Sequence, residues 1–318
     1  MNAPLILHVD ENHPLLVEGL ETLGYKNILA YETPIKEVLK NLHHYSGMVI
    51  RSRFPINKEF IDAGKNLKFI ARVGAGMENI DVEYAQIKNI LLIAAPEGNK
   101  NAVGEHTLGL LLSLMNKLRN GHQSIRQGDW LREEHRGWEL EGKTIGIIGY
   151  GNTGKKFAEK LKGFNVTILY NDILQGIGDK NATEASIKTL QEKSDVLSLH
   201  IPQNDSTYRM INTSFIKAMK KPFWFLNTAR GKAVVTEDLV EGLNSGKILG
   251  AGLDVLEYES SSFRSIFKKA NRPKALEHLL SAENVLLSPH VGGWTFESHR
   301  KLAQTILLGV LPSFIPLE

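Results

Sequence analysis

Short apolar runs alternate with amphipathic segments through the first hundred residues of the chain. Each apolar run is bounded by polar or glycine residues, which is typical of a buried strand. The segments between these runs repeat apolar residues at helical spacing. This alternation predicts a mostly parallel sheet with helices on its faces. The predicted strands are residues 5–9, 47–51, 69–73 and 90–94, and the predicted helices are 13–23, 56–63 and 82–88.

The alternation resumes at residue 143 and predicts a second doubly wound sheet. Its first strand, 143–149, is followed at once by an amphipathic helix, 151–162. One stretch, 260–278, has no regular period and is expected to be an irregular, partly helical excursion. The other predicted strands are 166–170, 196–200, 223–227, 249–255 and 284–288, and the other helices are 187–193, 214–218, 236–245 and 295–310.

Residues 103–119 predict a long helix that joins the two alternating regions. It is apolar over a wide arc, so it must be buried between domains, inside one domain or against another subunit. The last possibility favours a homodimer. The apolar positions are Leu108, Leu110, Leu111, Leu112, Leu114, Met115 and Leu118.

Length and composition narrow the class of protein. The 318 residues are enough for about two domains. The 38 basic and 35 acidic side chains are interleaved, so no nucleic-acid partner is expected, because phosphate binding needs clustered Lys and Arg. The lack of cysteine excludes thiolate catalysis and Cys-ligated zinc, and no metal site is predicted. Without a signal peptide or an apolar stretch near the roughly 20 residues of a membrane span, a cytoplasmic protein with no membrane partner is expected.

Residues 149–154, GYGNTG, match the dinucleotide pattern G-x-G-x-x-G between a strand and a helix. Gly149 would allow the tight turn, Gly151 the approach of a pyrophosphate, and Gly154 the close packing of helix on strand. The phosphates would then lie at the positive end of the helix. Asp172, about 20 residues further on, would accept hydrogen bonds from the ribose and repel the 2′-phosphate of NADP, so NAD is the predicted cofactor.

Three polar side chains follow apolar runs further along the chain: Arg230, Glu259 and His290. In open α/β sheets ligands bind at the carboxyl ends of strands, so these three could converge there. An arginine can hold a carboxylate and polarise a carbonyl, and a histidine can exchange a proton near neutrality. A carboxylate beside the histidine favours the imidazolium and fixes its tautomer. The set suits hydride transfer to the C2 carbon of a 2-oxo acid.

Several segments in this order make the chain similar to the D-isomer-specific 2-hydroxyacid dehydrogenase family, in particular its phosphoglycerate dehydrogenase-like branch. The resemblance covers nearly the whole chain. The matching segments are RSR at 51–53, GAGMENID at 74–81, GYGNTG at 149–154, LHIP at 199–202, NTARG at 227–231, DVLEYE at 254–259 and SPHVGG at 288–293.

This resemblance implies an α/β fold of two doubly wound parallel-sheet domains. A Rossmann NAD domain, 102–288, would be inserted into a flavodoxin-like substrate domain formed by 1–101 and 289–318. Arg230, Glu259 and His290 would be the catalytic residues, and backbone N–H groups near Ala75 and Gly76 would hold the substrate carboxylate. The residues lining NAD would be Gly149, Gly151, Asn152, Thr153, Gly154, Asp172, His200, Pro202, Thr228, Asp254, Gly292 and Gly293.

The chain departs from the family pattern at two places. Asn152 and Thr153 stand where the family often has Arg-Ile, which predicts looser contact with the cofactor phosphates. Ser260 stands where a proline usually follows the glutamate, and the excursion 260–278 replaces a short loop.

The identity of the acid depends on Arg51, Ser52 and Arg53, which follow a predicted strand. If the arginines face the substrate, they would bind a phosphate or second carboxylate, and the 3-phosphoglycerate/phosphohydroxypyruvate pair is favoured. If they face solvent or pack on Phe54, a glyoxylate or hydroxypyruvate reductase is equally credible. A noncatalytic NAD-sensing module like the C-terminal-binding-protein corepressors is the alternative from another class. Trp130, Trp138 and Trp294 are candidates for the pocket, a subunit interface or the core.

Overall fold

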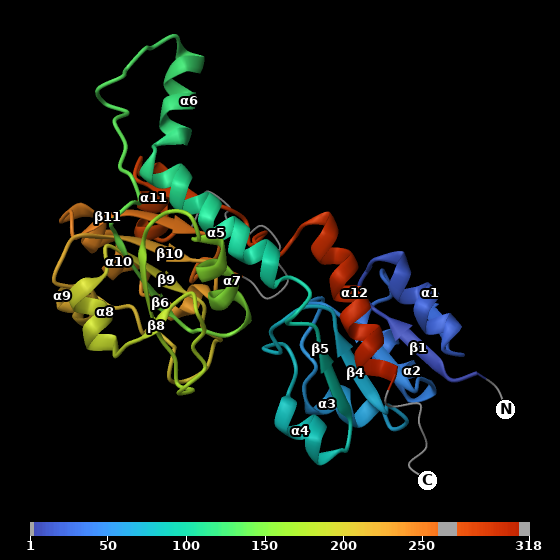
Figure 1. Cartoon of the computed structure of the whole chain (residues 1–318). Helices are drawn as coiled ribbons and strands as arrows, with labels where there is room; N and C mark the ends of the chain where they lie inside the picture. Colours follow the sequence, from blue (N-terminus) through green and yellow to red (C-terminus); the bar gives the residue numbers. More distant parts are fainter. Residues whose placement is uncertain (1–2, 260–271, 312–318) are drawn as a thin grey trace. The chain divides into compact units, whose positions relative to one another are not determined.

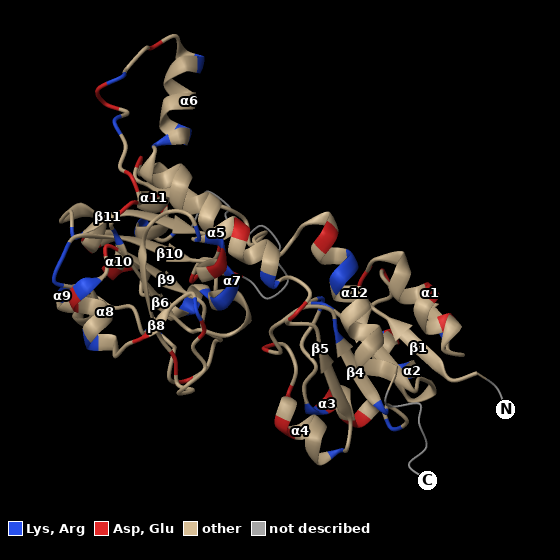
Figure 2. Ribbon diagram, viewed as in Figure 1, with Lys and Arg blue, Asp and Glu red and all other residues tan. Residues whose placement is uncertain are grey.

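The computed structural model describes residues 3–259 and 272–311, so most of the predicted excursion lies outside the described residues. The chain divides into two compact units (Figure 1). Unit 1 contains the chain up to Asn99 and from Trp294 onward. Unit 2 contains Lys100 to Glu259 and, among the described residues, the segment from Arg272 to Gly293. Lys and Arg are interspersed with Asp and Glu on each unit (Figure 2).

Unit 1 is built on a five-stranded parallel sheet of order β2-β1-β3-β4-β5. This is the flavodoxin-like order, as predicted. The strands are β1 Leu5–His8, β2 Lys26–Leu29, β3 Gly47–Ile50, β4 Phe69–Arg72 and β5 Leu91–Ala94, and the helices are α1 Pro14–Thr22, α2 Ile35–Asn41, the short 3-10 turn η1 Leu42–His44, α3 Lys58–Ala63, α4 Val82–Ile87 and α12 Phe296–Val310.

Successive residues of the strands in unit 1 face opposite sides of the sheet. Ile6 and Val49 lie in a core formed with α1 and α12, whereas Leu7 and Met48 lie in a second core formed with α2, α3 and α4. Besides the turn η1, two elements of this unit escaped sequence prediction. The strand β2 and the helix α2 were missed because β2, at the sheet edge, has half-exposed, mixed positions with no apolar run.

Unit 2 contains a seven-stranded parallel sheet of order β12-β11-β10-β9-β6-β7-β8. Counted from β6, this is the Rossmann order 3-2-1-4-5-6 with one further strand, so the predicted fold class is confirmed. The strands are β6 Thr144–Ile148, β7 Thr167–Asn171, β8 Thr183–Glu184, β9 Val196–Leu199, β10 Phe223–Asn227, β11 Ile248–Leu253 and β12 Val285–Leu287.

Helices cover both faces of this sheet. On one face Trp224 and Leu226 pack with α5 and α7, and on the other Phe225 packs with α8, α9, α10 and α11. The bounds are α5 Lys100–Met115, α6 Leu118–Gln127, α7 Asn152–Lys160, α8 Ile187–Lys193, α9 Thr213–Ala218, the 3-10 turn η2 Gly231–Ala233, α10 Thr236–Asn244 and α11 Lys274–Ser281.

The long helix predicted over 103–119 is wrong at its carboxyl end. Helix α5 stops at Met115, and Lys117 adopts a left-handed conformation with φ of 50° before α6 begins. A returning loop caps the break, because the N–H of Trp138 donates to the Met115 carbonyl at 3.1 Å. Gly104 brings α5 close to the backbone of α7. Leu110, Leu111 and Met115 of the apolar arc are buried inside unit 2, whereas Leu108, Leu112 and Leu114 are only partly buried. In Figure 1, α6 projects away from the sheet of its own unit, and none of its residues is buried.

Candidate active site

The glycine loop after β6 forms a cradle that fits a pyrophosphate. Gly149 has φ of 90°, and a Cβ there would lie 2.4 Å from the His200 carbonyl oxygen. A Cβ on Gly154 would lie 2.1 Å from the Gly149 oxygen, so this helix–strand contact also requires glycine. At Gly151 a Cβ would meet nothing within 4 Å, which leaves open space at the start of α7. No side chain caps this helix, so its first N–H groups suit a bound anion.

Asp172 follows β7 and is tied to the glycine loop. Its Oδ2 accepts a hydrogen bond from the N–H of Tyr150 at 2.6 Å, and its Oδ1 accepts one from the N–H of Leu174 at 2.9 Å. These two bonds fix the carboxylate beside the cradle, where the ribose of a dinucleotide lies in this fold.

Two residues of the glycine loop make side-chain contacts that the sequence did not indicate. Tyr150 is buried and stacks on Tyr170, with ring centroids 4.1 Å apart, while its hydroxyl donates to Asp179 at 2.8 Å. Thr153 contacts the Nδ1 of His200 at 3.2 Å. Desolvation lowers the pKa of His200 to about 3, so its ring is neutral near pH 7. His200 and Pro202, both predicted to line the cofactor, follow β9, the strand next to β6.

His290 and Glu259 are paired in the structure. Nδ1 of His290 lies 2.7 Å from Oε2 of Glu259, and the other oxygen of that carboxylate accepts a hydrogen bond from the N–H of Leu256 at 2.5 Å. His290 adopts a left-handed backbone with φ of 56°, which is uncommon for a residue with a side chain. Its N–H donates to the Asp254 carbonyl at 2.8 Å, which helps to hold this conformation.

Asp254 organises the loop that carries His290. Its carboxylate, 2% exposed, accepts hydrogen bonds from the N–H groups of Val291 and Gly292 at 2.9 and 2.7 Å and from the Ser288 hydroxyl at 2.6 Å. Burial by itself would raise the pKa of Asp254, but these bonds and the nearby His106 outweigh it and hold the pKa below its usual value. A Cβ on Gly292 would lie 2.8 Å from Oδ2 of this carboxylate.

Helix α5 contributes two side chains that sequence reasoning missed. Nε2 of His106 contacts the Ser288 hydroxyl at 2.8 Å, and the Thr107 hydroxyl contacts that of Thr228 at 2.9 Å. The available signal is the polar pair His106 and Thr107 beside the apolar arc of a helix that the sequence predicts only as a packing segment.

Arg230 follows β10 in extended backbone, and its Nη1 donates to the Ala229 carbonyl at 2.7 Å. The side chain of Asn227 donates to the Arg230 carbonyl at 3.0 Å, which fixes the loop. A Cβ on Gly231 would lie 2.0 Å from the Leu256 oxygen, so the Arg230 loop lies directly against the segment that leads to Glu259.

The predicted substrate residues of unit 1 follow β3 and β4. Asp10 accepts hydrogen bonds from the N–H groups of Arg51, Ser52 and Arg53 at 2.6, 3.1 and 3.3 Å. The guanidinium of Arg53 donates to three carbonyls, those of residues 9, 30 and 33, so this arginine links three loops of unit 1. Ala75 is exposed and Gly76 half-buried, just beyond β4.

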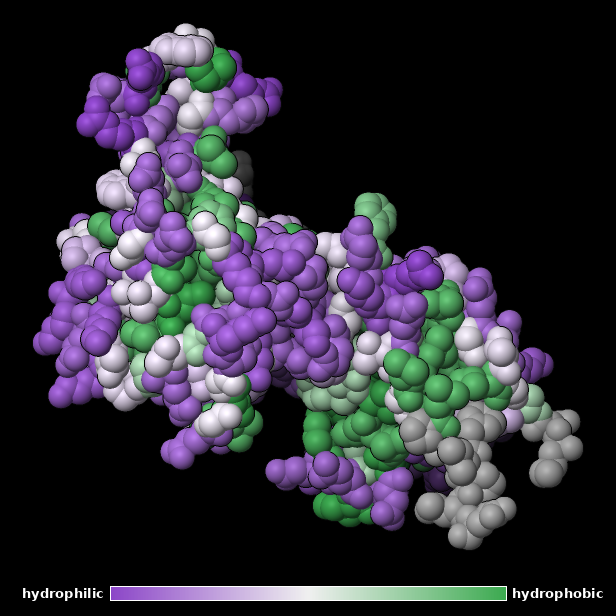
Figure 3. Space-filling model, in the orientation of Figure 1, coloured by the Kyte–Doolittle hydropathy of each residue, from purple (hydrophilic) through white to green (hydrophobic). Residues whose placement is uncertain are grey.

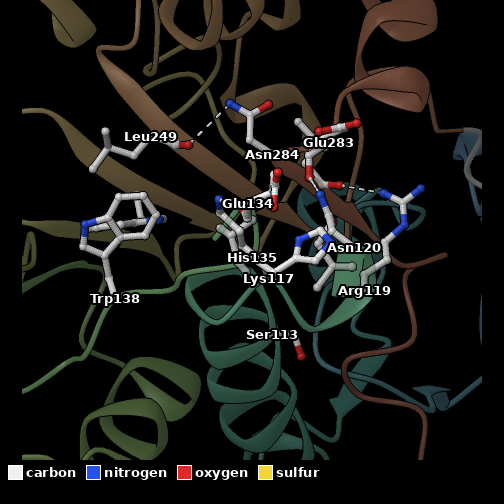
Figure 4. A pocket seen from close by; sticks show the side chains of 14 residues that line it. Ser113, Lys117, Arg119, Asn120, Glu134, His135, Trp138, Leu249, Glu283 and Asn284 are labelled. Atoms are coloured by element: carbon white, nitrogen blue, oxygen red, sulfur yellow. Dashed lines mark hydrogen bonds between the residues drawn. The ribbon is translucent and has the colours of Figure 1, made fainter. Parts of the chain in front are cut away.

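The cavity in Figure 4, of about 190 Å³, is lined by Trp138 but by none of the predicted catalytic, cofactor-binding or substrate-binding residues. Trp224, Leu249 and Val285 of its lining lie at the amino ends of β10, β11 and β12, whereas ligands of open α/β sheets bind at the carboxyl ends. Trp138 packs edge-on against Trp224 there, with centroids 5.5 Å apart.

In the described part of the chain, no helix has the length and hydropathy that a bilayer crossing requires. No group of three or more His, Asp or Glu side chains suited to a metal ion occurs among the same residues.

A dinucleotide cradle and a carboxylate-held histidine at the carboxyl ends of one Rossmann sheet define a nicotinamide-dependent oxidoreductase. Residues 108–292 match the family model described as the D-isomer specific 2-hydroxyacid dehydrogenase, NAD binding domain. The chain belongs to the D-isomer specific 2-hydroxyacid dehydrogenase family. The predictions of the family, of an enzyme acting on CH–OH donors and of NAD as cofactor are thereby confirmed.

Individual relatives have different names. A hydroxypyruvate reductase of Thermotoga maritima is 34% identical over 92% of this chain and 94% of its own. A D-3-phosphoglycerate dehydrogenase of Archaeoglobus fulgidus is 32% identical over 90% of this chain and 54% of its own. The crystal structure of a glyoxylate reductase from Paecilomyes thermophila has a TM-score of 0.86 and 26% identity, covering 100% of this chain and 97% of that one. These three relatives are therefore named for three different acids.

Proposed function

We propose that this chain interconverts a small 2-oxo acid and its D-2-hydroxy acid, with His290 as the acid–base group. The observation that carries the proposal is the 2.7 Å contact between Nδ1 of His290 and Glu259. Because the carboxylate holds Nδ1, proton exchange with the substrate oxygen falls to Nε2. Glu259 stabilises the imidazolium that must form when the hydroxy acid is oxidised.

The other groups bind and orient the acid. Arg230 holds the substrate carboxylate and polarises the carbonyl, because a guanidinium is a cation with a bidentate fork of donors. Backbone N–H groups near Ala75 and Gly76 hold the same carboxylate. NAD bound to unit 2 accepts or supplies the hydride at C2. We propose that unit 1 binds the substrate and unit 2 binds NAD; the expected domain boundaries, 101/102 and 288/289, lie two and five residues from those of the two units.

Asp172 is proposed to select NAD over NADP. Its carboxylate accepts hydrogen bonds from two backbone N–H groups, which fix it where it would meet the ribose and repel a 2′-phosphate. Asp172→Ala should lower the ratio of kcat/KM with NADH to kcat/KM with NADPH. An unchanged ratio would mean that another residue selects the cofactor.

For the substrate, we favour the 3-phosphoglycerate/phosphohydroxypyruvate pair. The support is Arg51: its half-buried guanidinium has no hydrogen-bond or ion-pair partner within residues 3–259 and 272–311. The second candidate is glyoxylate or hydroxypyruvate reduction, because relatives of about one-third identity are named for it.

A substrate panel tests both proposals. NADH oxidation is followed with phosphohydroxypyruvate, hydroxypyruvate and glyoxylate at matched concentrations. A kcat/KM highest for phosphohydroxypyruvate supports the first candidate, and one highest for glyoxylate or hydroxypyruvate supports the second. No turnover of any 2-oxo acid by protein that still binds NADH would overturn the proposed function.

We also propose a homodimer that forms through α6 and the loop after it. This arm projects from unit 2 and carries hydrophobic atoms among hydrophilic ones on its surface (Figure 3). Leu118, Ile125 and Trp130 on the arm are 57%, 53% and 78% exposed. Exposed apolar side chains on a protruding element favour association with a second copy. Sedimentation should show a dimer that Ile125→Asp weakens, and a wild-type monomer would contradict this.

A further inference from the structure

The loops at the switch point of unit 1 bring an acid and an arginine together. The strand order changes direction between β1 and β3, and ligands of such sheets bind beyond the carboxyl ends at that point. Asp10 follows β1, and Arg51 follows β3. The carboxylate of Asp10 accepts three backbone N–H groups, so it fixes the loop that carries Arg51.

The guanidinium of Arg51 lacks polar partners of its own in the described residues. Instead it lies over the ring of Trp294, 4.0 Å from the ring centroid. Burial lowers the pKa of Arg51, opposed by the charge of Asp10, yet an arginine stays protonated at neutral pH. The side chain is therefore a partly desolvated cation whose donors are available to an anion.

Trp294 is itself held by the start of α12. Thr295 caps this helix: its hydroxyl accepts the N–H of Ser298 at 3.0 Å, and the Ser298 hydroxyl accepts the N–H of Thr295 at 2.9 Å. Trp294 directly precedes this cap, and its ring contacts His299 with centroids 5.0 Å apart. A contact between the residue before the cap and the fourth helical residue fixes the direction in which the chain enters a helix.

His299 is supported in turn by unit 1. Its ring meets that of His13 edge-on at 5.4 Å, at the start of α1. Burial and the nearby charge of Arg51 lower the pKa of His299, so this ring is neutral and adds no competing cation beside the arginine. The stack runs from His13 through His299 and Trp294 to Arg51, and all four belong to unit 1.

We propose that Trp294 is a positioning residue that fixes the guanidinium of Arg51 toward a second anionic group on the substrate. It thereby sets a preference for 2-hydroxy acids that carry such a group over those that do not. This inference rests on the proposed function, and it assigns to Trp294 a role for which the sequence left pocket, interface and core as alternatives.

A matched pair of substrates tests it, since phosphohydroxypyruvate and hydroxypyruvate differ only in the phosphate. Trp294→Leu keeps an apolar side chain but removes the aromatic face. We expect it to raise KM for phosphohydroxypyruvate about tenfold, with KM for hydroxypyruvate and both kcat values changed less than about twofold. Trp294→Phe should keep most of the selectivity, and Leu308→Ala, at an exposed position of the same helix, serves as the control. Equal effects of Trp294→Leu on the two substrates, or none, would overturn the proposal.

A binding measurement separates this inference from the proposed function. Inorganic phosphate is titrated calorimetrically into the protein with NAD, and Kd should rise about tenfold in Trp294→Leu but little in Trp294→Phe. The same loss without turnover of any 2-oxo acid would refute the function and keep the role of Trp294. Turnover with an unchanged phosphate Kd in Trp294→Leu would refute the role of Trp294 alone. Melting curves confirm that each variant is folded.

Discussion

The charged groups around His290 in unit 2 and those around Arg51 in unit 1 are held in opposite ways. In unit 2, Asp254 and Glu259 have their oxygens occupied by named donors, and His290 is fixed between them. In unit 1, the described residues hold Arg51 through its backbone and through the face of Trp294. A group that moves protons needs a fixed orientation, whereas a group that recognises a substrate must keep donors available for it. The following predictions test this contrast.

The largest effect is expected at His290. His290→Ala removes the proposed proton carrier, so kcat should fall by about 10² to 10⁴ while NADH still binds, as fluorescence titration can measure. His44→Ala, at an exposed histidine of unit 1, is the matched control. Full activity in His290→Ala would show that the acid–base group lies elsewhere.

Arg51 should affect binding rather than turnover. Arg51→Gln removes the cation but keeps a side chain of similar reach, and we expect KM for phosphohydroxypyruvate to rise roughly 10- to 100-fold, as for a lost charged hydrogen bond. KM for hydroxypyruvate should hardly change. A parallel rise for both acids would mean that Arg51 contacts a part common to the two.

Asp254 should contribute stability that depends on pH. Its pKa is lower in the folded chain than in the unfolded one, so this contribution is present above the unfolded value and is lost as the pH falls through the folded value. In urea unfolding, Asp254→Asn should be less stable than wild type by about 1–3 kcal/mol at pH 7 and at pH 5, with a smaller gap below about pH 4. A gap that widens in acid would contradict the assignment.

The smallest effect on activity is expected at Arg53, which should contribute to stability, whereas Arg51 should contribute to substrate binding. Because its guanidinium donates to three carbonyls of unit 1 and lies over the ring of Phe54, 5.7 Å from the centroid, Arg53→Met should lower stability by about 1–3 kcal/mol and leave KM for every oxo acid unchanged. Thermal melts and the substrate pair check both parts. A selective rise in KM for phosphohydroxypyruvate would place Arg53 beside Arg51 in binding.

The fold was predictable where a local pattern coincided with burial. The strand β10, for example, begins and ends where the apolar run 223–227 does. The edge strand β2 has no such run, and the end of α5 depends on Trp138, a residue far along the chain. A local sequence pattern therefore predicts neither the strand β2 nor the end of α5.

For the candidate site, the pairing of Glu259 with His290 agrees with the sequence-based expectation, although the roles of these residues stay predictions. Arg51 and Arg53 look alike in the sequence, and only their partners separate them. The stack of Trp294 on Arg51 joins side chains more than two hundred positions apart, so no local spacing could indicate it.

The chain passes from unit 2 to unit 1 after Gly293, so His290 and Trp294 are separated by three residues yet belong to different units. A crossover between homologous genes at that junction would therefore exchange Trp294, the residue that positions Arg51, while Arg51 and His290 stay with one parent. The same junction is therefore a suitable fusion point for chimaeric dehydrogenases with altered substrate selectivity.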